Sequence, residues 1–110
     1  MSIMKIVGEQ ITVEVDLDHG ARLSSVKWNG TEFSIQKRES WLSWGWYSMV
    51  PWAGRILDGK MKASDGSILQ LRTDVLGPHA IHGLAFDKPW RDLLAECAGP
   101  VCPKSFAIRL

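Results

Sequence analysis

The stretch ITVEVDLD, residues 11–18, alternates apolar and polar side chains at every position, and this pattern limits the fold more than any other in the chain. Successive side chains of a β-strand point to opposite faces of its sheet, so a period of two is typical of a strand with one buried face and one solvated face. The sequence therefore predicts a half-buried strand over residues 11–18.

Two dipeptides mark tight turns. Asn29-Gly30 lies between RLSSVKW and TEFSI, and Asp65-Gly66 divides the segment GKMKASDGSILQL. Both dipeptides tolerate the positive φ angles that a two-residue hairpin turn requires. We therefore expect one β-hairpin centred on each dipeptide, with the polar segment QKRES, residues 36–40, as a loop between the two hairpins.

Helical periodicity is scarce, and only WRDLLAEC, residues 90–97, could form a short helix. Strand and turn signals recur at the spacing of a β-sandwich. The final segment differs, because residues 91–110 hold both cysteines and two of the five prolines without a sustained alternation. We predict an all-β fold, a partial β-sandwich over residues 1–90, followed by an atypical tail over residues 91–110.

The charges are balanced. Thirteen Lys and Arg residues face twelve Asp and Glu residues, and no basic block stands out along the 110 residues. Nothing therefore directs the chain toward nucleic acid or an anionic membrane. The chain has no apolar run of membrane-spanning length, and MSIMKIVGEQ lacks the apolar core of a signal peptide. We expect a soluble cytoplasmic protein of one domain with a small uncharged partner.

Motifs for metals, nucleotides and covalent catalysis are absent from the sequence. Cys97 and Cys102 are the only cysteines, and no nearby histidine completes a zinc site, so both are expected to be free thiols. The alternative is a local disulfide, which requires the two Cα atoms to lie within about 7 Å of each other. The chain contains no HExxH, no phosphate-binding glycine loop and no GxSxG nucleophile elbow. The sequence predicts no metal and no cofactor.

Two histidines stand three residues apart in GPHAIHGL, residues 77–84. This spacing would bring His79 and His82 together on a helix, but the flanking proline and glycine indicate a loop or a strand edge. On the residues alone, each histidine is expected to make a structural hydrogen bond. Arg55 begins a mostly apolar segment, where it either reaches solvent or offers its donor fork to a polar ligand, and the sequence alone favours solvent.

Six of the ten aromatic residues are tryptophans, and four of them fall in WLSWGWYSMVPW, residues 41–52. Large aromatics dominate the cores of small sandwiches, and their faces also stack on the C–H face of a sugar ring. We expect most of these tryptophans in the core, with one or two available to a ligand. His19 stands beside Gly20 in a turn and is expected to be solvated.

Three segments together resemble the amino-terminal part of the aldose 1-epimerase family, also called the galactose mutarotase-like proteins. ITVEVDLDHGARLSSVKWNGTEF resembles the opening strands and hairpin of that family, MVPWAGRILDGKM its strand-and-arginine segment, and HAIHGLAFDKPW its His-Gly motif with a downstream tryptophan. The three segments occur in the family's order, and the resemblance extends from about Ile11 to Trp90.

The resemblance implies a large β-sandwich, often called a supersandwich, that interconverts the α and β anomers of free aldoses without a cofactor. His82 matches the catalytic region's His-Gly histidine, which contacts the sugar near the reacting centre. Arg55 matches an arginine that binds sugar hydroxyls, and Trp52 is a candidate for lining the sugar site. His79 lies outside the motif and is expected to be structural, and Trp90 is expected to pack.

The chain also departs from the family. The family's second histidine, assigned as the acid, and its glutamate base match no residue here, and Glu96 lies in a tail that does not resemble the family. We therefore expect a truncated or frameshifted product with impaired activity, and self-association through an uncovered sheet. Two alternatives are a non-catalytic carbohydrate-binding module and an inert fragment.

Overall fold

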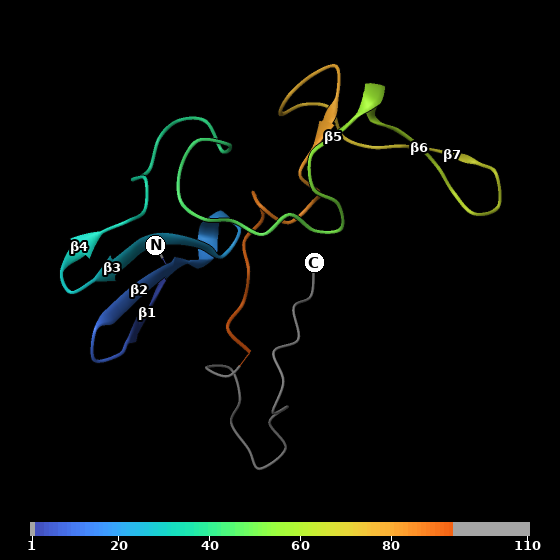
Figure 1. Cartoon of the computed structure of the whole chain (residues 1–110). Coiled ribbons are helices and arrows are strands. Elements are labelled where there is room, and N and C mark those ends of the chain that lie inside the picture. Colours follow the sequence, from blue (N-terminus) through green and yellow to red (C-terminus); the bar gives the residue numbers. More distant parts are fainter. Residues whose placement is uncertain (1, 94–110) are drawn as a thin grey trace, which may run out of the picture.

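The computed structural model describes residues 2–93 (Figure 1), and strands dominate its regular structure. The strands pair in antiparallel ladders, and the only helices in this part of the chain are two single turns of 3-10 helix. The all-β prediction is therefore confirmed for the described residues. None of their helices has the length and apolar character needed to cross a membrane.

The amino-terminal strands form a four-stranded antiparallel sheet in sequence order. They are β1 (Ile3–Val7), β2 (Ile11–Asp16), β3 (Arg22–Trp28) and β4 (Thr31–Glu32). In the central part of the sheet, Val13 lies opposite both Ile6 and Val26. Residues opposite one another share a face, so these side chains form one apolar row across three strands.

The predicted strand over residues 11–18 ends two residues early, at Asp16. The next three residues form the 3-10 turn η1 (Leu17–His19), because the Asp16 side chain accepts a hydrogen bond from the Asp18 N–H at 3.1 Å. Gly20, with a φ of 77°, then reverses the chain. The strand β1 was not predicted, since SIMKIV shows no regular alternation of apolar and polar residues.

The hairpin at Asn29-Gly30 is confirmed, with φ angles of 46° and 83° at the two residues. Its returning strand is shorter than TEFSI. One oxygen of the Glu32 carboxylate accepts hydrogen bonds from the backbone N–H groups of Val26, at 3.0 Å, and Ser34, at 3.1 Å. The carboxylate thus takes the place of a strand carbonyl, and the regular pairing ends at Glu32.

A second group of short strands lies away from this sheet in Figure 1. Its elements are β5 (Arg55–Ile56), η2 (Leu57–Gly59), β6 (Lys60–Lys62), β7 (Ile68–Gln70) and β8 (Ala80–Ile81). The strands β6 and β7 form the hairpin predicted at Asp65-Gly66, and the Asp65 carboxylate accepts a hydrogen bond from the Ser67 N–H at 2.8 Å. The strand β5 pairs with the distant β8.

The tryptophans differ from the expectation. Of the tryptophans in the described part of the chain, only Trp44 is buried, whereas Trp28 and Trp46 are 48% and 51% exposed. The prediction that most tryptophans form the core is therefore wrong. The fully buried Arg22 lies over the rings of Trp41, Trp44 and Tyr47, so part of the interior that the tryptophans were expected to fill is occupied by a cation.

The carboxyl-terminal predictions lie largely outside the described residues. Residues 90–93 are not helical, and the rest of the helix considered over residues 90–97 is beyond them, as are Glu96, Cys97 and Cys102. Trp90 is placed, and its indole N–H donates a hydrogen bond to the Ala85 carbonyl at 3.0 Å. Its backbone N–H donates to the Leu17 carbonyl at 2.8 Å.

Candidate functional site

The β5–β8 ladder brings together two of the residues that the sequence singled out. The register places Arg55 opposite Ile81, and His82 follows Ile81 directly at the end of β8. The Arg55 side chain is exposed, and its positive charge lies close enough to His82 to lower the pKa of the imidazole. Segments well separated in the sequence thus place a guanidinium beside an imidazole.

Reciprocal hydrogen bonds with Gly54 fix both the backbone and the ring of His82. The His82 N–H donates to the Gly54 carbonyl at 3.0 Å, and the Gly54 N–H donates to Nδ1 of His82 at 3.0 Å. A backbone N–H can only donate, so Nδ1 carries no proton. In the neutral ring the proton is therefore on Nε2, which is a hydrogen-bond donor.

The pKa of His82 is lowered, chiefly by burial and secondly by the charge of Arg55. The imidazole is thus neutral at pH 7. The folded state binds a proton on His82 less readily than the unfolded chain does. The contribution of His82 to the free energy of unfolding is therefore complete above the ordinary histidine pKa of about 6.5. It is lost as the pH falls toward the pKa of the folded state. A neutral N–H donor beside a guanidinium suits a ligand rich in oxygen atoms.

Replacing Arg55 with methionine should raise the pKa of His82, because the substitution removes a neighbouring positive charge and keeps the bulk of the side chain. The pKa should still stay below the ordinary histidine value, since burial is the larger cause. NMR titration of the ring protons measures the shift. Arg38→Met is the control, and an unchanged His82 pKa in Arg55→Met would show that the two groups do not interact.

His79 makes the structural hydrogen bond that was predicted for it. Its Nδ1 accepts from the Asp58 N–H at 3.1 Å, just as Nδ1 of His82 accepts from the Gly54 N–H. Asp58 and Gly54 lie on either side of β5, so the two histidines bracket the β5–β8 ladder from its two ends. The two Nδ1 atoms therefore accept from different backbone N–H groups.

Trp52 precedes Arg55 by three residues and is half-buried. Its indole N–H is buried and has no hydrogen-bond partner within the described part of the chain. A buried indole N–H normally finds an acceptor, so this donor marks Trp52 as unusual among the tryptophans.

Tyr47 completes the surroundings of His82, although no sequence motif marks it. Its ring centroid lies 6.0 Å from that of His82 and 5.7 Å from that of Phe86. Its hydroxyl donates to the Leu42 carbonyl at 3.2 Å. Burial raises the pKa of Tyr47, and the positive charge of Arg22 partly offsets that rise.

Arg22 supports the Tyr47 ring that contacts His82. The guanidinium is fully buried and lies 4.8 Å from the Tyr47 ring centroid. It donates hydrogen bonds to four backbone carbonyl groups, those of His19 (2.8 Å), Trp41 (2.9 Å), Trp44 (3.0 Å) and Phe86 (2.8 Å). Burial lowers its pKa, and the charges around it oppose this effect. One side chain thus joins the four-stranded sheet to the segments before and after the site.

His19 was expected to be solvated, and the structure shows instead that it is largely enclosed. Its side chain is 22% exposed, and Nδ1 lies 2.9 Å from the buried Asp16 carboxylate. The ring also contacts Trp41 and Trp44, with centroids 5.2 and 5.7 Å away. The turn η1 places the imidazole between a carboxylate and two indoles, so it is enclosed even though it belongs to a turn.

A second arginine ties the segment after His82 to the rest of the fold. Arg72 Nε and Nη2 each donate to an Asp74 carboxylate oxygen at 2.8 Å, and Nη1 donates to Asp87 at 2.8 Å. These bonds raise the pKa of Arg72 and lower that of Asp74 to about 2. The side chains of this arginine and its two aspartates border a cavity of about 300 Å³ together with Trp41.

The described residues contain no cluster of three or more His, Cys, Asp or Glu side chains that could hold a metal ion. Comparisons with known proteins assign no relationship: no family model, no curated protein and no solved structure matches the chain significantly.

Proposed function

We propose that the chain is an aldose 1-epimerase-like protein in which His82 and Arg55 bind an aldohexose. The observation that carries this proposal is the pairing of β5 with β8, which places a neutral imidazole N–H donor beside a guanidinium. Sugar hydroxyls and the ring oxygen are acceptors for such donors. On this proposal residues 1–90 are the amino-terminal part of a galactose mutarotase-like supersandwich, followed by an atypical tail.

Trp52 and Tyr47 support the same proposal. The buried indole N–H of Trp52 lacks a partner in residues 2–93, and a sugar oxygen would supply an acceptor. The Tyr47 ring stands beside the His82 ring and offers an aromatic surface of the kind that packs on the C–H face of a pyranose. The proposed ligand is therefore uncharged, ring-shaped and rich in hydroxyl groups.

Anomer exchange requires a base for the anomeric hydroxyl and an acid for the ring oxygen. His82 is a poor proton-transferring acid, because protonation of Nδ1 would break the hydrogen bond from the Gly54 N–H. Its neutral Nε2–H instead polarises a sugar oxygen through a hydrogen bond. Positioned acids and bases contribute about 10²- to 10⁴-fold each, so a chain in which no residue matches the family's glutamate base is expected to bind sugar better than it accelerates mutarotation.

Hexose binding should be weakened about tenfold in His82→Ala, the loss expected for one hydrogen bond in a partly enclosed site. His79→Ala is the matched control, because it removes an equivalent ring-to-backbone hydrogen bond at the other end of β5. Sugar titration followed by NMR measures the affinity, and polarimetry of a freshly dissolved anomer measures catalysis.

Equal losses in His82→Ala and His79→Ala would show that the effect is structural. Absence of binding with every hexose tested would overturn the proposal. Binding without faster mutarotation would identify a non-catalytic carbohydrate-binding module, the alternative that the fixed tautomer of His82 favours.

A further inference from the structure

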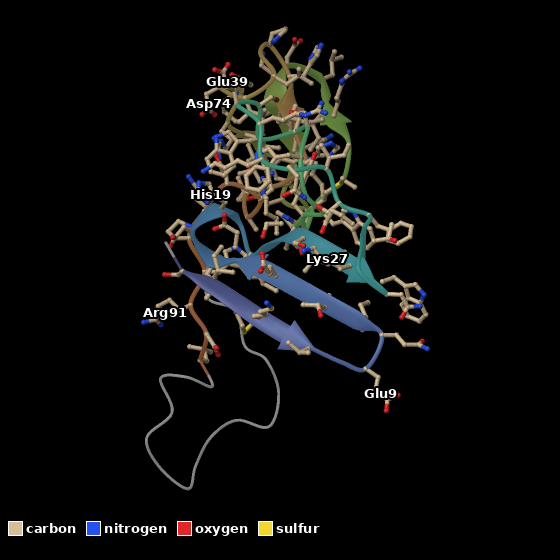
Figure 2. All side chains as sticks on the ribbon, turned by 90° about the vertical axis from the view of Figure 1, so that its left-hand side faces the viewer. Glu9, His19, Lys27, Glu39, Asp74 and Arg91 are labelled. Carbon is tan, nitrogen blue, oxygen red and sulfur yellow. The ribbon has the colours of Figure 1, made fainter. Side chains whose placement is uncertain are left out.

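A second cavity, of about 170 Å³, adjoins η1 at the end of the four-stranded sheet, and none of the residues of the β5–β8 site borders it. Its lining residues are His19, Lys37, Arg38, Glu39, Trp41 and Trp44. Figure 2 shows His19 and Glu39 along the same side of the molecule. Two indole rings, an imidazole and three charged side chains thus meet in one small space.

The polar side of this cavity has a defined hydrogen-bonding pattern. The buried Asp16 carboxylate can only accept, so Nδ1 of His19 donates to it over 2.9 Å. Nε2 of His19 lies 3.2 Å from Nζ of Lys37 and accepts from that ammonium group. This contact holds the Lys37 charge at the cavity, and the ammonium retains two further N–H groups for another acceptor.

The indole walls disfavour a cationic ligand. The guanidinium of Arg22 lies 5.2 Å from the ring centroid of Trp41 and 4.2 Å from that of Trp44, so both rings already bind a buried cation. Lys37 and Arg38 outnumber Glu39 among the charged lining residues, which gives the lining a net charge of +1. Both features favour an anion in the cavity.

The volume limits the size of that anion. An apolar cavity of about 150 Å³ holds a benzene molecule, so 170 Å³ accommodates one six-membered ring. Indole faces pack on aromatic rings and on the C–H face of a pyranose. We propose that this cavity binds a six-membered ring that carries one carboxylate, with the ring against Trp41 and Trp44 and the carboxylate on Lys37 and Arg38.

Isothermal titration of the full chain with sodium benzoate and sodium glucuronate tests the proposal, with benzamide and glucose as the uncharged counterparts. At least one carboxylate should bind in the millimolar range, and Lys37→Met with Arg38→Met should weaken it about tenfold or more. Stronger binding of benzoate would identify an aromatic acid as the ligand, and stronger binding of glucuronate a hexuronic acid.

Lys60→Met with Lys62→Met is the matched control, since it removes the same charge from β6, whose lysines are exposed. This pair should change the affinity less than about twofold. Equal affinity for a carboxylate and its uncharged counterpart, equal losses in the two double variants, or no binding of either carboxylate would overturn the proposal. His82→Ala should leave carboxylate binding intact, so failure here and failure of hexose binding at His82 are separate results.

Discussion

Arg22→Met should lower the free energy of unfolding by about 3–5 kcal/mol, a large part of the 5–15 kcal/mol that a small domain has in total. The substitution leaves four carbonyl groups without the donor that now serves them. It also removes the cation that lies over the rings of Trp41, Trp44 and Tyr47. Urea unfolding followed by circular dichroism measures the loss.

Arg22→Lys and Arg38→Met make this test specific. Lysine keeps the charge but has fewer donors and no planar fork, so it should recover only part of the lost stability. Arg38 is exposed, and its replacement should change stability by less than about 0.5 kcal/mol. A wild-type unfolding midpoint in Arg22→Met would show that the four hydrogen bonds do not stabilise the fold.

Gly83→Ala should destabilise the fold by about 2–5 kcal/mol and remove hexose binding. Gly83 has a φ of 82°, which costs an alanine about 1–2 kcal/mol. An added Cβ would also lie 2.0 Å from the Val50 carbonyl oxygen, an overlap that adds about 1–3 kcal/mol or more. Because Gly83 directly follows His82, the backbone shift that relieves the overlap would displace the imidazole.

Gly54→Ala separates these two costs. Gly54 has a similar φ of 79°, but a Cβ there meets no atom within 4 Å, and both hydrogen bonds to His82 use the backbone of Gly54. This variant should therefore lose only about 1–2 kcal/mol and still bind a hexose. Thermal unfolding and the NMR sugar titration give both quantities. Similar losses of stability in Gly83→Ala and Gly54→Ala would show that the overlap with the Val50 carbonyl adds little to the cost of the positive φ.

The hairpins were predictable from the sequence because their signals are local. Asn29-Gly30 and Asp65-Gly66 specify turn geometry within two residues, and the alternation over ITVEVDLD located β2. Its end was missed, because the apolar–polar alternation continues to Asp18 although the Asp16 side chain caps a turn from residue 17 on. The strand β1 carries no alternation and owes its place to pairing with β2.

The candidate site was only partly predictable. His82 and Arg55 were named from motifs, but the hydrogen bond that sets the tautomer of His82 comes from Gly54, which no periodicity could pair with it. Arg22 was missed because an arginine in a strand is usually solvated. One local signal existed: Trp41, Trp44 and Tyr47 recur at every third residue, and all three rings face Arg22.

The two arginines that tie the fold together differ in what could release them. Arg72 is held by Asp74 and Asp87, and strong acid, near the Asp74 pKa of about 2, would neutralise the Asp74 carboxylate. Arg22 is held by peptide oxygens, which acquire no proton under the same conditions. Acidification therefore weakens the ion pairs of Arg72 but not the hydrogen bonds of Arg22. The contact between the four-stranded sheet and the aromatic segment should persist at a pH at which the Arg72 ion pairs are weakened.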